Sequence, residues 1–272
     1  MLHVLIADSG STKTDWALGA QRFHTQGISP VHLSDGQIVG ILREELLPQL
    51  RVDIGEIRFY GSGIRPEQEQ RMTALLSSVF PSAGRITAKS DMLGAAIALC
   101  HHDEGQPCIL GTGANSCLYD GSKILMNTPP LGYILGDEGS GAVLGREFLN
   151  ALYKGRLYDG AREEFEQHFD TSLPDVISRV YRQPLANRWL ASLSPFVHDH
   201  LAEPTVQGIV VDNFRRFIQR NILPYRRPDL PLSAVGSIAY YYQEQLREAA
   251  SREGYAVGRI LRSPIDGLVE VE

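Results

Sequence analysis

The stretch "VLIADSGSTKTDW", residues 4–16, begins as an apolar strand and continues into small and hydroxyl-bearing residues. Asp8 stands at the junction, and Gly10, Ser11, Thr12 and Lys13 follow it. A turn with so little side-chain bulk lets backbone N–H groups approach an anion closely. It therefore predicts a loop for a nucleotide phosphate, with donors added by Thr12 and Lys13. The alternative is an ordinary hairpin in which Asp8 caps the turn.

A second stretch, "PCILGTGANSCLYDGSKILM" at residues 107–126, repeats the plan of residues 4–23. Each has an apolar strand, a glycine-containing turn, a strand, a tight turn and a third strand. An internal repeat of this kind predicts two related α/β halves. The matched turn, Gly111–Gly113 with Thr112 at its centre, makes the phosphate interpretation stronger than either loop alone would.

Composition and charge exclude several classes of function. The 272 residues are 43% hydrophobic and 21% charged, as in an ordinary globular protein, and the formal net charge is −6. A nucleic-acid-binding surface would require a basic patch. No apolar run approaches the roughly 20 residues of a membrane span, and a cytoplasmic location is the default expectation. The P-loop pattern G-x-x-x-x-G-K-[ST] is missing, which excludes that class of ATPase.

The chain has three cysteines, at positions 100, 108 and 117. An odd and small number argues against a disulfide framework. Their spacing lacks the short C-x2-4-C pair of a typical zinc site, so reduced thiols are expected.

Strands and helices alternate in the first part of the chain, and helices dominate after residue 140. Strands are expected at 22–27, 56–64 and 84–90, and helices at 34–50, 66–80 and 91–102. Further helices are expected at 140–155, 174–181, 185–201, 205–223 and 237–254, followed by a short strand at 255–261 and a last turn at 263–270.

"ITAKSDMLGAA", residues 86–96, places Ser90 and Asp91 where a strand gives way to a helix. A helix needs one N-cap, and either residue can supply it. The other is then available, and a carboxylate at this position can accept a proton from an attacking hydroxyl group.

Two later motifs carry further candidate residues. "GDEGSG", residues 136–141, sets Asp137 and Glu138 among glycines just before a helix. The acids could merely complement the helix dipole, but a cap does not require three glycines, and paired carboxylates suit sugar hydroxyl groups or a metal. "AVGSIAYYY", residues 234–242, reads as a strand, a turn at Gly236 and Ser237, and a helix whose N-terminus suits a nucleotide.

These motifs occur in the order and spacing of a known group. The chain resembles the BadF/BadG/BcrA/BcrD ATPase family, and within it the N-acetylglucosamine kinase-like proteins of the sugar kinase, Hsp70 and actin superfamily. The resemblance runs from residue 4 to about residue 268. It implies an α/β, two-lobed actin-like ATPase fold with duplicated ribonuclease-H-like domains. The expected lobes are residues 1–106, with 258–272 as a candidate completion, and residues 107–257 with helical insertions.

The resemblance also implies roles for particular residues. ATP would bind Asp8, Gly10, Ser11, Thr12, Lys13, Gly111, Thr112, Gly113, Gly236 and Ser237. Asp8 would be the carboxylate associated with Mg²⁺, and Asp91 the general base that activates the sugar 6-hydroxyl group. The sugar would contact Ser29, Gly63, Asn115, Asp137 and Glu138. In "QGISP", Ser29 occupies the place where N-acetylglucosamine kinases carry a sugar-contacting Asn.

The leading hypothesis is therefore an ATP-dependent kinase of an amino sugar, of the N-acetylglucosamine, glucosamine or N-acetylmuramic acid class. ATP and Mg²⁺ are the expected cofactors, and a small sugar is the expected partner, without nucleic acid or membrane. A homodimer is an open option. One alternative is an ATPase that activates a radical dehydratase, which would need cysteines for an iron–sulfur cluster. The other is a non-catalytic module that binds a sugar or a nucleotide.

Overall fold

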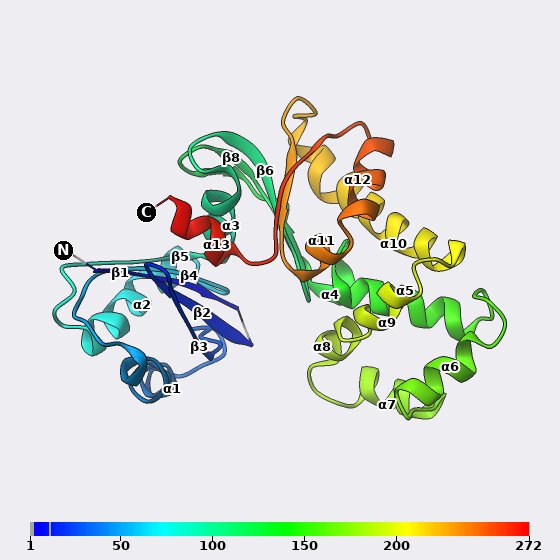
Figure 1. The fold of residues 1–272 in the computed structure, drawn as a ribbon, viewed down its shortest axis with the longest axis horizontal. Coiled ribbons are helices and arrows are strands. Elements are labelled where there is room, and N and C mark those ends of the chain that lie inside the picture. Colours follow the sequence, from blue (N-terminus) through cyan, green and yellow to red (C-terminus); the bar gives the residue numbers. More distant parts are fainter. Residues whose placement is uncertain (1–2, 11, 272) are drawn as a thin grey trace. The chain divides into compact units, whose positions relative to one another are not determined.

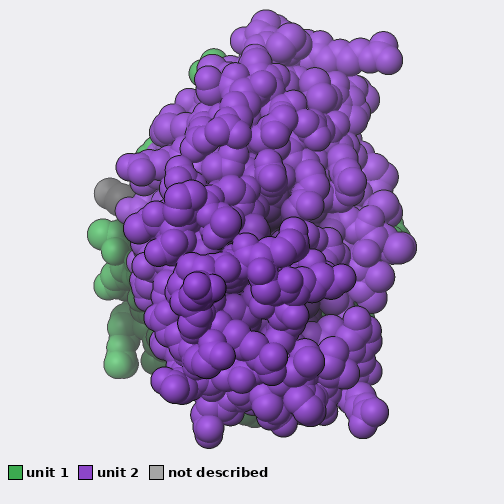
Figure 2. Space-filling model, turned by 90° about the vertical axis from the view of Figure 1, so that its right-hand side faces the viewer, with its two compact units in different colours: residues 1–103, 121–123, 263–272 green, residues 104–120, 124–262 purple. Residues whose placement is uncertain are grey.

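The computed structural model describes residues 3–10 and 12–271, so Ser11 of the first turn lies outside the described residues. The chain divides into two compact units, which are drawn in Figure 1 and coloured separately in Figure 2. Unit 1 comprises residues 1–103, 121–123 and 263–272, and unit 2 comprises residues 104–120 and 124–262. The second boundary falls at 262/263 and not at 257/258, because the strand at 257–261 pairs within the sheet of unit 2, and the first falls at 103/104, where the first strand of unit 2 begins.

Unit 1 is a mixed sheet in the strand order β3-β2-β1-β4-β5. Its strands are β1 (His3–Ser9), β2 (Lys13–Leu18), β3 (Gln21–Gln26), β4 (Ile54–Gly61) and β5 (Arg85–Ser90). Its helices are α1 (Asp35–Ile41), the π-turn η1 (Leu42–Leu46), the 3-10 turn η2 (Leu47–Gln49), α2 (Pro66–Val79), α3 (Asp91–Cys100) and α13 (Pro264–Glu270). Figure 1 shows α1 and α2 on one face of this sheet and α3 and α13 on the other.

The core of unit 1 forms because β1 is central and covered on both faces. Leu5, Ile6 and Ala7 are all buried, as expected for a strand with helices above and below it. Trp16 on β2 is fully buried against Phe59, and its indole N–H donates to Thr25 at 3.0 Å. The indole thereby keeps a hydrogen-bond partner inside the core.

Unit 2 repeats the plan of unit 1. Its sheet has the order β11-β10-β6-β8-β9, with β7 also paired to β6. Its strands are β6 (Glu104–Leu110), β7 (Ala114–Ser116), β8 (Leu118–Asp120), β9 (Ile124–Met126), β10 (Leu232–Val235) and β11 (Val257–Leu261). Read in the opposite direction, this order matches that of unit 1, with β7 and β8 together in the place of β2. The predicted duplication is confirmed.

The helices of unit 2 fill the interval between β9 and β10 and the interval between β10 and β11. They are α4 (Gly132–Leu135), α5 (Gly141–Tyr153), α6 (Ala161–His168), α7 (Leu173–Tyr181), α8 (Ala186–Ala191), α9 (Ser194–Asp199), α10 (Pro204–Phe217), the π-turn η3 (Ile218–Ile222), the 3-10 turn η4 (Leu223–Tyr225), α11 (Ser237–Tyr241) and α12 (Gln243–Arg252). In Figure 1, α6 and α7 lie well away from the sheet of unit 2.

Two helices predicted as continuous are broken. The helix expected at 185–201 is divided into α8 and α9, since Pro195 in the first turn of α9 has no N–H to continue the preceding ladder. The helix expected at 237–254 is interrupted at Tyr242, whose φ and ψ of −110° and 29° are not helical.

The last helix before the fourth strand of the shared plan, which is β4 in unit 1 and β10 in unit 2, ends in the same way in both units. In unit 1, α1 leads into the π-turn η1 and the short 3-10 turn η2 of sequence "LPQ". In unit 2, α10 leads into the π-turn η3 and the short 3-10 turn η4 of sequence "LPY". This correspondence extends the duplication beyond the strands.

Candidate functional site

The carboxyl ends of β1, β4 and β5 meet at one edge of the sheet in unit 1. These strands are parallel, and Ser9 pairs with Gly61, which in turn pairs with Ser90. Asp8 precedes Ser9 in β1, and Asp91 follows Ser90 at the end of β5. The negative charge of Asp91 contributes to the raised pKa of Asp8, so the two carboxyl groups are electrostatic neighbours. Unit 1 thus brings together the predicted metal-associated carboxylate and the predicted general base.

Asp8 lies among carboxylates. Burial raises its pKa to about 7, and the charges of Asp15 and Asp91 add to the shift, while Lys13 opposes it. Asp15 is the direct partner of Asp8 across the β1–β2 pair. A carboxyl group whose pKa is raised by burial and by neighbouring carboxylates is a suitable environment for a cation.

The donor set in unit 1 fits Mg²⁺ bound together with phosphates. Among residues 3–10 and 12–271, no cluster of three or more acidic, histidine or cysteine side chains could enclose a metal. Mg²⁺ typically keeps several waters and uses one or two carboxylates together with phosphate oxygens. Asp8 alone, or Asp8 with Asp91 or Asp15, would therefore suffice to hold it.

Asp91 is not the N-cap of α3, because the neighbouring Ser90 takes that position. The Ser90 hydroxyl group accepts a hydrogen bond from the N–H of Leu93 at 3.3 Å and is the N-cap of α3. The Asp91 carboxylate accepts from the N–H of Met92 at 2.8 Å. Burial raises its pKa above the usual range, although that hydrogen bond favours the charged form. A carboxylate with a raised proton affinity at the carboxyl end of a parallel strand is suited to accept a proton.

Backbone hydrogen bonds hold the first glycine turn, and its described residues are exposed to solvent. Gly10 donates its N–H to the carbonyl of Lys13 at 3.0 Å, and the carbonyl of Thr12 accepts from Gly27 at 3.0 Å. Gly10, Thr12 and Lys13 are exposed, and the Lys13 ammonium group contacts Asp15 at 2.9 Å. Sequence reasoning offered Lys13 as a phosphate donor and did not identify this ion pair.

A buried hydroxyl pair holds the segment that carries Ser29. Ser9 and Thr14 lie 2.6 Å apart between their hydroxyl oxygens, and both accept from the N–H of Ile28. Ser29 itself is buried, and a Cβ at Gly63 would lie 3.1 Å from its hydroxyl oxygen. Ser29 and Gly63 are therefore close neighbours in unit 1. Sequence reasoning missed Ser9 and Thr14, although hydroxyl residues inside apolar strands were a visible signal.

The second glycine turn in unit 2 lies against the start of α5. Gly111 donates to the carbonyl of Gly113 at 3.0 Å, and its own carbonyl accepts from Gly141 at 2.8 Å. The carbonyl of Thr112 accepts from Ala142 at 3.2 Å. The first amides of α5 thus bind the carbonyl groups of this turn.

The turn before α11 approaches the same loop. Gly236 has a φ of +121°, and a Cβ there would lie 2.3 Å from the carbonyl oxygen of Leu110. Only glycine permits this approach, which places Gly236 and the neighbouring Ser237 beside the start of the Gly111–Gly113 turn. The structure therefore brings together the nucleotide-binding residues predicted in unit 2.

Asp137 is held against the second glycine turn. It has a left-handed φ of +57°, and a Cβ on Gly113 would lie 3.1 Å from its carboxylate oxygen. Burial raises the pKa of Asp137, and Glu138 adds to the shift, while the N–H of Ala114 opposes it. Ser140 is the N-cap of α5, accepting from Val143 at 3.1 Å. As at α3, a serine supplies the helix cap, so the carboxylate of Asp137, three residues before Ser140, is not used as the cap.

Glu138 and Asn115 have partners that the sequence did not predict. The Glu138 carboxylate is buried and bonded to the guanidinium of Arg220. The side-chain oxygen of Asn115 accepts from the N–H of Ser116 and from the amide of Asn127, each at 2.9 Å. Their predicted roles as sugar contacts remain predictions.

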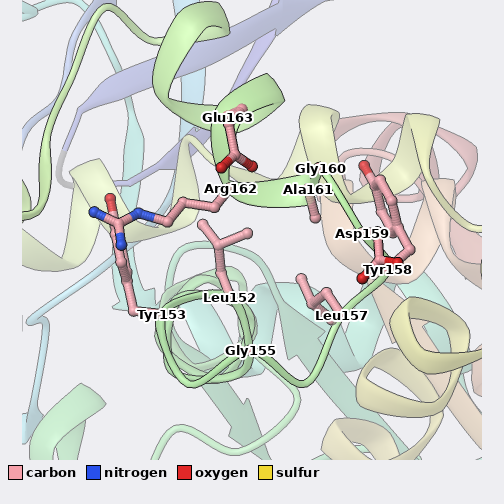
Figure 3. Close-up of a pocket in the computed structure, with 10 residues that line it drawn as sticks. All are labelled: Leu152, Tyr153, Gly155, Leu157, Tyr158, Asp159, Gly160, Ala161, Arg162 and Glu163. Atoms are coloured by element: carbon pink, nitrogen blue, oxygen red, sulfur yellow. The ribbon is translucent and has the colours of Figure 1, made fainter.

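A separate hollow of about 290 Å³ lies in unit 2 between the end of α5 and the start of α6 (Figure 3). Leu152 and Leu157 form its apolar part, and Arg162 lies over the ring of Tyr153. The guanidinium of Arg162 is already paired with Glu166 at 3.0 Å. None of the predicted site residues lines this hollow.

The cysteines are thiols, as predicted. Cys108 and Cys117 are buried and Cys100 is half-buried. Within the part of the chain that the structure describes, no helix is long and apolar enough to cross a membrane.

Two units with the same strand order, each with a glycine turn after its first strand, define an actin-like sugar kinase fold. A protein of Porphyromonas gingivalis described as a "putative N-acetylglucosamine kinase" is 46% identical to the chain, with a TM-score of 0.96 and 98% of each chain covered. The chain therefore belongs to the N-acetylglucosamine kinase-like family of sugar kinases.

More distant structures share the fold. A Chromobacterium violaceum protein described in the same words is 14% identical, with a TM-score of 0.74 and coverage of 100% and 99%. A Streptomyces griseus ROK family glucokinase, solved with glucose and AMPPNP, is 11% identical, with a TM-score of 0.56 and coverage of 99% and 97%. No protein-family model matches the chain, and neither does any curated protein. The descriptions of these proteins do not mention the BadF/BadG/BcrA/BcrD ATPase family, but the matches are consistent with it.

Proposed function

We propose that the protein transfers the γ-phosphoryl group of ATP to a hydroxyl group of an amino sugar. The observation that carries the proposal is the pairing of Ser90 and Asp91, in which the serine caps α3 and leaves the half-buried carboxylate of Asp91 as an electrostatic neighbour of Asp8. Glycine turns at equivalent places of the two sheets support it, as does the description of the Porphyromonas relative.

The proposed chemistry is mainly positioning and charge neutralisation, as in phosphoryl transfer generally. Backbone N–H groups of the two glycine turns would hold the phosphates, and Lys13 would add a positive charge. Mg²⁺, when held through Asp8, would neutralise charge on the phosphate oxygens. Asp91 would accept the proton of the attacking hydroxyl group. Gly236 and Ser237 would contact the adenosine.

The proposed sugar contacts are Ser29, Gly63, Asn115 and Asp137. Glu138 belongs to the same loop as Asp137, and because Arg220 holds its carboxylate, we expect it to act mainly on the shape of that loop. N-Acetylglucosamine, glucosamine and N-acetylmuramic acid are the candidate substrates.

A coupled assay of ADP release over a panel of sugars tests the proposal. We expect at least one amino sugar to stimulate Mg²⁺-dependent ADP release well above the rate without sugar. Tight sugar binding without turnover would instead indicate a binding module. Sugar-independent ATP hydrolysis by a protein purified with bound iron would indicate a dehydratase activator. Either result would overturn the proposal.

A further inference from the structure

Asn213 on α10 is a buried amide whose two hydrogen bonds both go to the loop after Asp137. It is fully buried. Its side-chain oxygen accepts from the N–H of Gly139 at 2.9 Å, and its NH₂ group donates to the carbonyl of Ser140 at 3.2 Å. A buried amide with both functions satisfied favours one placement of the backbone that it binds.

Two further residues on the same helical face bind the same loop. Phe217 lies one turn beyond Asn213, and a Cβ at Gly139 would lie 2.9 Å from the Cβ of Phe217. The loop backbone therefore packs directly on this helix. One turn further, Arg220 binds the buried carboxylate of Glu138. Side chains at i, i+4 and i+7 thus hold residues 138–140.

Asn221, which lies with Arg220 in the π-turn η3, contacts a second loop. The carbonyl of Asn221 accepts from the hydroxyl group of Thr128 at 2.9 Å, and the Tyr225 hydroxyl oxygen lies 2.8 Å from that of Ser116. The N–H of Thr128 donates to Tyr225 at 3.0 Å. A π-turn changes the angular position of the residues that follow it. Ser116 is adjacent to Asn115, so this segment also holds the strand that carries Asn115.

We propose that residues 204–225 form a positioning element for the sugar-side residues of unit 2, with Asn213 and Arg220 as positioning residues that set the direction of Asp137. The inference rests on the proposed function, in which Asp137 and Asn115 contact the sugar. Asp137 adopts a left-handed backbone conformation, which a non-glycine residue keeps only when its surroundings enforce it. The contacts of Asn213, Phe217 and Arg220 supply that enforcement.

The first test is hydrogen exchange in the ligand-free protein, followed in a peptide that spans residues 136–142. We expect exchange at least about tenfold faster in Asn213→Ala and Arg220→Gln, a factor equivalent to about 1.4 kcal/mol. Arg220→Lys keeps the charge and should recover most of the protection. Arg215→Gln is the matched control, since Arg215 lies on the same helix and pairs with Glu253 at 2.8 Å, away from the loop. Unchanged exchange in Arg220→Gln would overturn the inference, even if Asn213→Ala does not fold.

The second test is kinetic. In the folded variants we expect KM for the sugar to rise about tenfold with KM for ATP unchanged, and Arg215→Gln to behave as the wild type. An equal rise in both KM values would indicate a general structural role and contradict the inference. If the wild type phosphorylates no sugar, the proposed function fails, while the exchange experiment still decides whether this segment holds the loop.

Discussion

Asp8 is the residue whose environment is most specific to ligand binding. Burial, together with the negative charges of Asp15 and Asp91, raises the pKa of its carboxyl group to about 7 from an ordinary value of 3.8. Such an arrangement disfavours the charged form in the empty protein. It becomes favourable when a divalent cation is present, because the same carboxylates then face positive charge.

Asp8→Asn should stabilise the ligand-free protein at neutral and alkaline pH. A raised folded-state pKa means that the folded state binds the proton more tightly than the unfolded state does. The stabilising effect of this proton is complete below pH 3.8 and is lost as pH rises through about 7. Thermal unfolding in the presence of a chelator should therefore give a midpoint for Asp8→Asn several degrees higher at pH 8 and close to that of the wild type at pH 4.

The exposed Asp53, in the same unit, provides the control. Asp53→Asn should leave the midpoint unchanged at both pH values. A lower midpoint for Asp8→Asn at pH 8 would show that its carboxylate is stabilising without a cation, contrary to this account. Adding Mg²⁺ should raise the midpoint of the wild type more than that of Asp8→Asn.

Ser29→Ala tests the sugar side of unit 1. The backbone of its segment is held by Ser9 and Thr14 through Ile28, so loss of one hydroxyl group should leave the fold intact. We expect KM for the sugar to rise about threefold to tenfold, the value of a single neutral hydrogen bond, with KM for ATP unchanged. Steady-state kinetics with each substrate varied in turn give both values. An unchanged KM for every sugar tested would remove Ser29 from the site.

Among the elements, the turn before α11 shows most clearly how a close backbone approach shapes the site. A Cβ at Gly236 would lie 2.3 Å from the carbonyl oxygen of Leu110 and 3.3 Å from the nitrogen of Gly111, so any side chain at position 236 would push the turn away from the start of the Gly111–Gly113 loop. The proposed adenosine contact and the proposed phosphate loop therefore depend on one glycine.

Gly236→Ala should weaken nucleotide binding and destabilise the protein by about 3 kcal/mol, from overpacking together with backbone strain. Gly254→Ala is the matched control, because its φ is +81° but no atom lies within 4 Å of its added Cβ. It should cost about 1–2 kcal/mol from backbone strain alone and leave ATP affinity unchanged. Denaturant unfolding and calorimetric titration with ATP measure the two effects. Equal costs for the two variants would contradict the close approach.

Short-range patterns predicted much of the fold and the local structure around the candidate site residues. The glycine turns after β1 and β6 and the choice between Ser90 and Asp91 as a cap depend on neighbouring residues, so the sequence displays them directly. The interaction of Glu138 with Arg220 spans 82 residues and that of Asn213 with Gly139 spans 74, and no local pattern indicates either. The break at Tyr242 was missed because the helical periodicity continues across it.

At the scale of the whole molecule, the chain builds the same sheet twice and returns to the first unit at its end. Residues 263–272 belong to unit 1, where α13 packs so closely on α3 that a Cβ at Gly267 would lie 2.3 Å from the carbonyl of Ala98.

The most direct test of this account is the transfer of the γ-phosphoryl group from ATP to the most active amino sugar of the panel by the wild type and by Asp91→Asn. Calorimetry should first establish that both proteins bind the nucleotide and the sugar alike. We predict that kcat then falls by at least about 100-fold in Asp91→Asn, the lower end of the contribution of a general base. Transfer by Asp91→Asn at the rate of the wild type would contradict the account.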